Sequence, residues 1–173
     1  MNNTKIKIGV LGGSFDPAHK GHLAISKEAK KIFKLKKIIW AITKKNPFKK
    51  QSNISISVRM KFCKKVIGEN NFIKVKFYED KIRSNKTIKL INHLLDYKKN
   101  EIYFLMGADN LINFHKWHKW REISQKCKIV VFDRQGYKKK SLNSITFKRL
   151  NNKNLKFIKF DKVNISSSQL RKI

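Results

Sequence analysis

A glycine-rich turn that carries two histidines constrains this chain more than any other segment. It reads GGSFDPAHKGH from Gly12 to His22, and it lies between an apolar strand candidate and a helix predicted over Lys20 to Phe33. The glycines let the backbone approach a ligand because they have no Cβ. The helix that follows directs its unpaired amides and positive dipole end into the same space, which favours phosphate. We therefore predict a nucleotide-phosphate site at this turn.

The two histidines of the turn have more than one interpretation when taken alone. His19 and His22 are three residues apart, so their rings lie near one another on a helix. Such a pair can donate to phosphate, hold a metal ion or cap the helix. The glycines directly before the pair favour chemistry on a nucleotide phosphate over the other two roles.

The composition is that of a globular chain with a packed core. The chain has 173 residues, of which 40% are apolar, and we expect a single domain over residues 1–173. No apolar run approaches the roughly 18 residues of a membrane helix, and no signal peptide precedes the first strand. Cys63 and Cys127 lack Cys-x-x-Cys spacing and are predicted to be buried thiols, so the cytoplasm is the expected location.

The net charge of +31 bears on the partners that the chain would attract. Only six of the 42 basic residues are arginine, although arginine is the residue preferred for bidentate recognition of bases and phosphates. Lysine, asparagine and isoleucine are abundant together, which is typical of a codon bias towards A and T. We expect the charge to attract anionic nucleotides, less so at high salt, and we keep a basic nucleic-acid-binding domain as an alternative function.

Strand and helix patterns alternate along the chain. The strand candidates are Lys5 to Leu11, Lys37 to Ile42, Phe72 to Tyr78, Glu101 to Met106, Lys128 to Phe132 and Leu155 to Phe160. The helix candidates are Lys20 to Phe33, Ser55 to Ile67, Thr87 to Tyr97, Trp117 to Gln125 and a last one that begins at Ser166 to Ser168. Lys138 to Ser141 is predicted to be a solvated loop. This order predicts an α/β fold, a Rossmann-like doubly wound parallel sheet with helices on both faces, which binds ligands beyond the carboxyl ends of its strands.

The glycine turn resembles the signature of the nucleotidyltransferase superfamily, in which a glycine-rich turn precedes His-x-Gly-His. Here the match is HKGH from His19 to His22. The resemblance implies that both histidines contact the triphosphate of ATP and stabilise the transition state. It also implies that the preceding residues approach the nucleotide, namely Gly12, Gly13, Ser14 and Phe15.

A second segment, FLMGADN from Phe104 to Asn110, is followed by an aromatic stretch. Gly107 permits a tight turn, and Asp109 can accept from a ribose hydroxyl or cap the next helix. The segment is similar to one in bacterial nicotinate-nucleotide adenylyltransferases, where a Phe-x-x-Trp element follows the turn. The resemblance implies that Trp117 stacks on the pyridine ring and that the His118 backbone amide helps to hold the ring carboxylate. Pantetheine-phosphate adenylyltransferases share the first and last motifs but lack this element.

The chain closes with ISSSQLR, from Ile165 to Arg171. Consecutive hydroxyls at a helix start can bind an anion or simply cap the helix. The segment resembles the closing Ile-Ser-Ser-Thr-x-x-Arg motif of the superfamily, with Ser168 in place of threonine. The resemblance implies that Ser167 and Ser168 bind ATP and that Arg171 supports catalysis.

Three weaker elements complete the resemblance. An Asn-Pro loop follows the second strand, and the resemblance implies that Asn46 contacts the nicotinate nucleotide. It also implies that a lysine of this loop neutralises phosphate. Lys49 takes that position, and Lys44 and Lys45 are the alternatives. Ser84 keeps a hydroxyl where the family contacts the nicotinate carboxylate, although the tyrosine and aspartate of that family motif are absent. Arg134 matches the family's arginine turn without its usual proline, and the resemblance gives this residue a contact with the phosphates of ATP.

The resemblance implies adenylyl transfer from ATP to nicotinic acid mononucleotide, which gives nicotinic acid adenine dinucleotide and pyrophosphate. A pantetheine-phosphate adenylyltransferase-like enzyme is the nearest alternative. The resemblance also implies Mg²⁺ carried on the ATP phosphates, and the sequence offers no dedicated carboxylate cage for it. The sequence leaves open the preference for the acid over the amide substrate and the oligomeric state, a homo-oligomer included.

Overall fold

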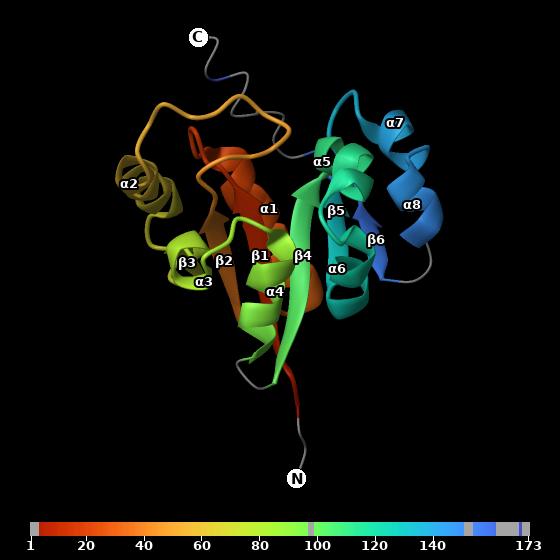
Figure 1. The fold of residues 1–173 in the computed structure, drawn as a ribbon, viewed down its shortest axis with the longest axis horizontal. Helices are drawn as coiled ribbons and strands as arrows, with labels where there is room; N and C mark the ends of the chain where they lie inside the picture. Colours follow the sequence, from red (N-terminus) through yellow and green to blue (C-terminus); the bar gives the residue numbers. More distant parts are fainter. Residues whose placement is uncertain (1–3, 97–98, 151–153, 162–169, 171–173) are drawn as a thin grey trace.

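Six parallel strands form one sheet in the computed structural model, which describes residues 4–96, 99–150, 154–161 and 170. The strands lie in the order β3-β2-β1-β4-β5-β6 (Figure 1). Their bounds are β1 Ile6–Gly13, β2 Lys37–Ile42, β3 Ile73–Lys76, β4 Asn100–Gly107, β5 Lys128–Phe132 and β6 Leu155–Ile158. All five neighbouring pairs run parallel. The predicted fold class is therefore confirmed.

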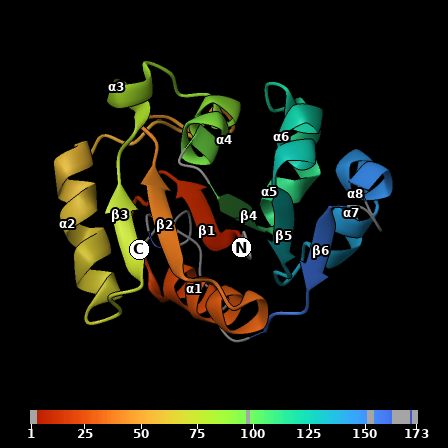
Figure 2. The same ribbon diagram turned by 90° about the horizontal axis from the view of Figure 1, so that it is seen from below.

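Helices cover both faces of this sheet. In Figure 2, α1 (Lys20–Phe33) lies on one face, and α4 (Thr87–Asp96) and α6 (Trp120–Lys126) lie on the other. The helix α2 (Ile56–Ile67) contributes Cys63 and Ile67 to the core cluster that also contains Ala29 of α1. The shorter elements are α3 Glu79–Ile82, α5 Ala108–Asn113, the 3₁₀ turn η1 Phe114–Lys116, α7 Lys138–Leu142 and α8 Ile145–Leu150. No helix in the described part of the chain is long and apolar enough to span a bilayer.

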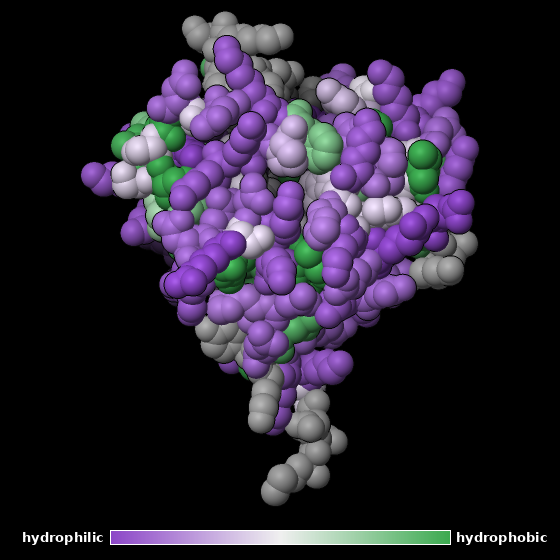
Figure 3. Space-filling view, viewed as in Figure 1, coloured by the Kyte–Doolittle hydropathy of each residue, from purple (hydrophilic) through white to green (hydrophobic). Residues whose placement is uncertain are grey.

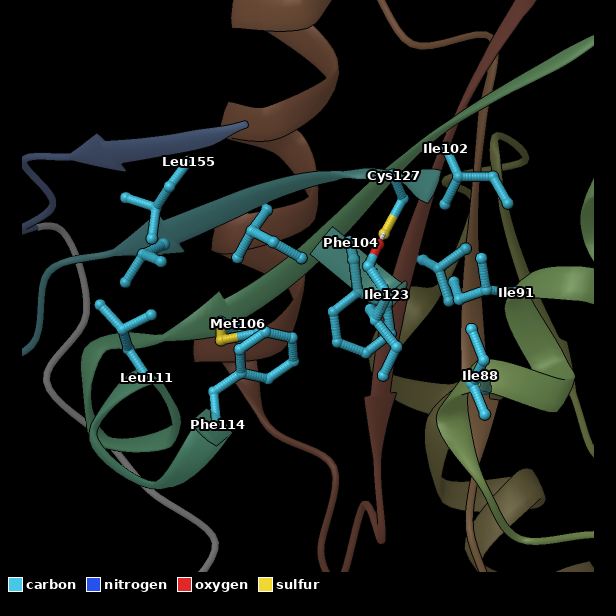
Figure 4. Packing of buried hydrophobic residues seen from close by; sticks show 14 of the residues in the cluster. Ile88, Ile91, Ile102, Phe104, Met106, Leu111, Phe114, Ile123, Cys127 and Leu155 are labelled. Atoms are coloured by element: carbon cyan, nitrogen blue, oxygen red, sulfur yellow. Dashed lines mark hydrogen bonds between the residues drawn. The ribbon is translucent and has the colours of Figure 1, made fainter. Parts of the chain in front are cut away.

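The strands supply two apolar cores by alternation. On β4, Phe104 and Met106 belong to one core, while Leu105 points into the other. Figure 4 shows the first core, in which Ile91 of α4 and Ile123 of α6 face the strands. Because both faces are buried, the strands read as continuous apolar runs, as parallel strands do.

The order of the strands creates a crevice between β1 and β4. From β1 the chain passes to β2 and β3 on one side, and it returns to β4 on the other side. The segments that follow β1 and β4 therefore diverge at the carboxyl edge of the sheet, and ligands of such sheets bind at this point. Both predicted motifs, the glycine turn and the segment around Gly107, begin here.

Two predicted segments differ from the structure. Trp117 does not begin a helix: its backbone is extended, with φ −74° and ψ 143°, and α6 begins only at Trp120. The loop predicted at Lys138 to Ser141 is wrong as well, because α7 forms there and buries Ser141, although the three lysines are solvated as predicted. Such short helices depend on tertiary packing more than on their own propensity. The predicted C-terminal helix lies outside the described residues apart from Leu170, which is helical.

We predict that Ile91→Ala destabilises the fold far more than Ile32→Ala. Ile91 is fully buried between α4 and the sheet, so its truncation leaves a cavity and costs about 2–5 kcal/mol of unfolding free energy. Ile32 on α1 is 42% exposed, and its truncation should cost less than about 1 kcal/mol. Urea denaturation of both variants measures the difference. Equal losses would contradict the assignment of α4 to the core.

Candidate active site

A cavity of about 500 Å³ opens at the carboxyl ends of β1 and β4. All predicted site residues that the structure describes line it, and they come from five separate segments of the chain. They are Gly12, Gly13, Ser14, Phe15, His19, His22, Asn46, Lys49, Ser84, Gly107, Asp109, Trp117, His118 and Arg134. The predicted residues Ser167, Ser168 and Arg171 lie outside the described part of the chain. Hydrophilic side chains cover most of the face seen in Figure 3.

His19 and His22 cap the first turn of α1 reciprocally. The Nδ1 atom of His19 accepts from the Gly21 amide at 3.1 Å, and the Nδ1 atom of His22 accepts from the His19 amide at 3.2 Å. The two ring centroids are 3.8 Å apart. An Nδ1 atom that accepts a hydrogen bond carries no proton, so each neutral ring carries its proton on Nε2. Each ring is thereby a hydrogen-bond donor through Nε2.

Burial and nearby cations keep both rings neutral. The pKa of His19 is lowered from 6.5 to about 4, chiefly by burial and in addition by the positive charges of Arg134 and Lys49. The pKa of His22 lies well below 6.5, because burial disfavours the charged ring and because His19, Lys49 and Arg134 lie nearby. Two neutral donors beside two cations form a site that favours a polyanion.

Aromatic packing and a short chain of hydrogen bonds hold His22 in place. Phe15 is buried, stacks on Trp40 at 5.0 Å between centroids and contacts the His22 ring at 4.8 Å. Trp40 donates from Nε1 to the Ser26 hydroxyl at 2.8 Å, and Ser26 donates to the His22 carbonyl oxygen at 2.9 Å. The sequence analysis did not identify Trp40 and Ser26 as part of the site. The signal for them was weak, because only the fold brings β2 against α1.

The three lysines of the loop after β2 that are candidates for the phosphate contact differ in whether they line the cavity. Lys44 pairs with Asp80 at 2.7 Å and does not line the cavity. Lys45 and Lys49 both line it, and Lys49 is close enough to lower the pKa of both histidines. The Asn46 carboxamide oxygen accepts from the Phe48 amide at 2.9 Å, so Asn46 also shapes this loop. The geometry therefore favours Lys49.

An ion pair joins the loops after β4 and β5. Arg134 donates from Nη1 to the Asp109 carboxylate at 2.7 Å, and both side chains are mostly buried. Gly107 leaves room for this carboxylate, since a Cβ there would lie 2.5 Å from Asp109 Oδ1. The pair holds a carboxylate that can accept from a ribose hydroxyl next to a guanidinium that can meet phosphate.

Trp117 forms an aromatic wall on the β4 side of the cavity. Its ring meets Phe114 and Phe104 edge-on, with centroids 5.1 Å and 6.0 Å away. The neighbouring His118 is exposed, and Ser84, near the start of α4, accepts from the Lys86 amide at 3.1 Å. All three predicted ring-binding residues therefore line the same cavity as the histidine pair.

The cytidylyltransferase-like family model matches residues 10–173 of the sequence. This chain belongs to the cytidylyltransferase-like family. Family membership was predicted from the His-x-Gly-His turn, and it is confirmed.

Relatives with curated names agree with this family. The chain is 68% identical over 173 residues to a protein of Pelagibacter ubique named probable nicotinate-nucleotide adenylyltransferase, and the match covers 100% of this chain and 96% of that one. A protein of Nitratiruptor with the same name is 38% identical, and the match covers 77% of this chain and 76% of the other.

Solved structures share the fold of this family member. The nicotinic acid mononucleotide adenylyltransferase of Plasmodium falciparum complexed with NaAD is similar, with a TM-score of 0.77 and 19% identity, over 96% of this chain and 82% of that chain. The same enzyme complexed with APC gives a TM-score of 0.78 with the same coverage. At this identity the likeness concerns the fold.

We predict that the paired histidines make the family member less stable as the pH falls from 6.5 towards 4. In that pH range His19 binds a proton in the unfolded chain but not in the folded chain. The free energy of unfolding therefore decreases as the pH falls. Above pH 6.5 this contribution is absent. His19→Asn keeps an acceptor at the start of α1 without titrating, so its stability should depend less on pH. Urea denaturation from pH 7.5 to 4.5 tests this, and parallel curves would contradict it.

Proposed function

We propose that this chain transfers the adenylyl group of ATP to nicotinic acid mononucleotide, giving nicotinic acid adenine dinucleotide and pyrophosphate for NAD biosynthesis. One observation carries the proposal: a pair of neutral histidine donors at the start of α1 shares a cavity with the Trp117 ring. The first feature is suited to the triphosphate and the second to an aromatic base. The names of the relatives, at up to 68% identity for those above, support the same activity.

The groups around the glycine turn are assigned to ATP. The backbone at Gly12 and Gly13 approaches the nucleotide, and the Nε2 atoms of His19 and His22 donate to its phosphates. Lys49 and Arg134 neutralise charge that moves onto the leaving pyrophosphate. The mononucleotide phosphate attacks the α-phosphorus in line, so the protein positions the reactants and forms no covalent intermediate.

Mg²⁺ enters this scheme with ATP, as part of the substrate. Among the residues that the structure describes, no three histidine, cysteine, aspartate or glutamate side chains are grouped to hold a metal ion. We therefore assign no residue to the metal and derive no step from it. Asp109 is assigned to a ribose hydroxyl, and the closing motif with Ser167, Ser168 and Arg171 remains a prediction from the sequence.

The pyridine half of the substrate is assigned to the β4 side of the cavity. Trp117 offers its face to the ring, and Asn46, from the loop after β2, lines the same cavity and is assigned a contact with this substrate. The Ser84 hydroxyl and the His118 backbone amide are assigned to the ring carboxylate. We infer that residues 1–173 act as one nucleotidyltransferase domain in the cytoplasm, where the free cysteines Cys63 and Cys127 would stay reduced.

Release of pyrophosphate from ATP tests the proposed function. Purified protein is assayed with nicotinic acid mononucleotide, with its amide and with 4′-phosphopantetheine in parallel, and a folded His22→Ala variant controls for contaminating enzyme. We expect turnover with the acid substrate and a loss of at least about 10²-fold in the variant, since a donor to transition-state charge is removed. Turnover with 4′-phosphopantetheine alone, or steeply salt-dependent RNA binding without pyrophosphate release, would contradict the proposal.

We predict that Trp117→Ala raises KM for the pyridine substrate by about 10- to 100-fold and leaves KM for ATP nearly unchanged, because a stacking face is lost on one side of the cavity only. Trp120→Ala is the matched control. Trp120 packs on Phe114 and does not line the cavity, so its removal should leave the KM for the pyridine substrate unchanged. Steady-state kinetics of both variants test this prediction. Equal changes in the KM values for ATP and for the pyridine substrate in Trp117→Ala would indicate that Trp117 has only a structural role.

A further inference from the structure

Arg59 is a buried cation that the proposed chemistry does not use. It lies on α2, it is 3% exposed, and it does not line the cavity. It shares the buried face of the helix with Cys63 and Ile67, at positions where an apolar residue is expected. A charged group in such a place is costly unless hydrogen bonds and opposite charges compensate for it. Its partners therefore indicate what it is for.

The partners of Arg59 are backbone carbonyls of the site loops. Its Nη1 atom donates to the carbonyl oxygen of Ser14 at 2.7 Å and to that of Thr43 at 2.9 Å. Its Nε atom donates to the carbonyl oxygen of Ile54 at 3.0 Å, which fixes the direction of the guanidinium. Burial lowers the pKa of Arg59, and the negative charge of Asp16 opposes this effect. One guanidinium thus joins the glycine turn after β1 to the loop after β2.

Thr43 is the junction at which the second loop is held. Its amide donates to the Gly13 carbonyl oxygen at 2.9 Å, its own carbonyl accepts from Arg59, and its hydroxyl donates to Glu79 of α3. The Glu79 carboxylate also accepts from the Lys44 amide at 3.3 Å. The loop that leaves this junction carries Lys49. The place of Lys49 relative to the histidines therefore depends on bonds made several residues earlier.

We propose that Arg59 is a positioning residue, which sets the distance between the histidine turn and the Lys49 loop by holding the Ser14 and Thr43 carbonyls together. The consequence for adenylyl transfer rests on the proposed function. The planar guanidinium can serve two carbonyls from one nitrogen and a third from Nε in a fixed fork, whereas the ammonium of a lysine is a point donor on a flexible stem. Holding the two carbonyls in place therefore requires the geometry of the guanidinium in addition to its charge.

The test compares Arg59→Lys and Arg59→Met with wild type and with Lys61→Met. Lys61 is exposed on the same helix, so Lys61→Met removes the same charge from α2 without touching the loops. We expect both Arg59 variants to lose kcat by about 10- to 100-fold, because small displacements of positioning groups have effects of this size. We expect KM for the pyridine substrate to change little, and Lys61→Met to behave as wild type. Wild-type kcat in Arg59→Lys would overturn the proposal.

Two further measurements separate positioning from simple loss of stability and from failure of the proposed function. Ile91→Ala is less stable for reasons unrelated to the site, so its kcat per folded molecule should equal that of wild type. Hydrogen exchange needs no substrate: the Thr43 and Lys44 amides should exchange faster in Arg59→Lys than in Lys61→Met. If Arg59→Met does not fold, the exchange rates of the Thr43 and Lys44 amides are compared in Arg59→Lys and in Glu79→Gln, which alters the bonds to Thr43 and Lys44 at the same junction. Unchanged exchange at both amides in Arg59→Lys would refute the anchor, whatever substrate the wild type uses.

Discussion

Two hydrogen bonds between backbone amides and imidazole nitrogens determine how this site can work. A helix start leaves amides unsatisfied, and most chains satisfy them with a hydroxyl or a carboxylate. A carboxylate at this point would repel the phosphates that the turn has to admit. In α1 the cap is His19, and no acidic residue lies in the first turn. The neutral rings satisfy two amides through Nδ1 and keep an Nε2 donor each. The same two side chains therefore begin the helix and, under the proposed function, supply the donors to phosphate.

The charges around the histidine pair are arranged so that the cations lining the cavity repel one another only weakly. Arg134 is paired with Asp109, and the burial of His19 and His22 keeps both rings uncharged. Lys49 then adds a cation at the edge of the cavity. A bound polyanion would meet donors from both histidines together with positive charge from two loops. The overall charge of +31 acts over a longer range and is screened by salt, so it affects encounter more than geometry.

The sequence predicted the sheet and the convergence of the motifs because both follow from short-range patterns. Apolar runs identify buried parallel strands, and their carboxyl ends lie at one edge. The short helices α3, α5, α7 and α8 were not predicted, because four to six residues show too little periodicity and are stabilised by packing. Arg59 was missed for a related reason: the two partners that join the site loops are 16 and 45 residues away. The available signal was a charge in register with the buried Cys63 and Ile67.

The two halves of the cavity are held by different physical means. On the β1 side, Arg59 donates and Glu79 accepts directional hydrogen bonds with main-chain groups of the loops, and under the proposed function these anchors place the reacting groups. On the β4 side, Trp117 is held by edge-on contacts with Phe104 and Phe114, which tolerate small shifts. Directional anchors suit the transfer of a phosphoryl group, where alignment decides the rate. Aromatic packing suits a flat ring, where contact area decides affinity, so under the proposed function rate and recognition are divided between the two central strands of the sheet.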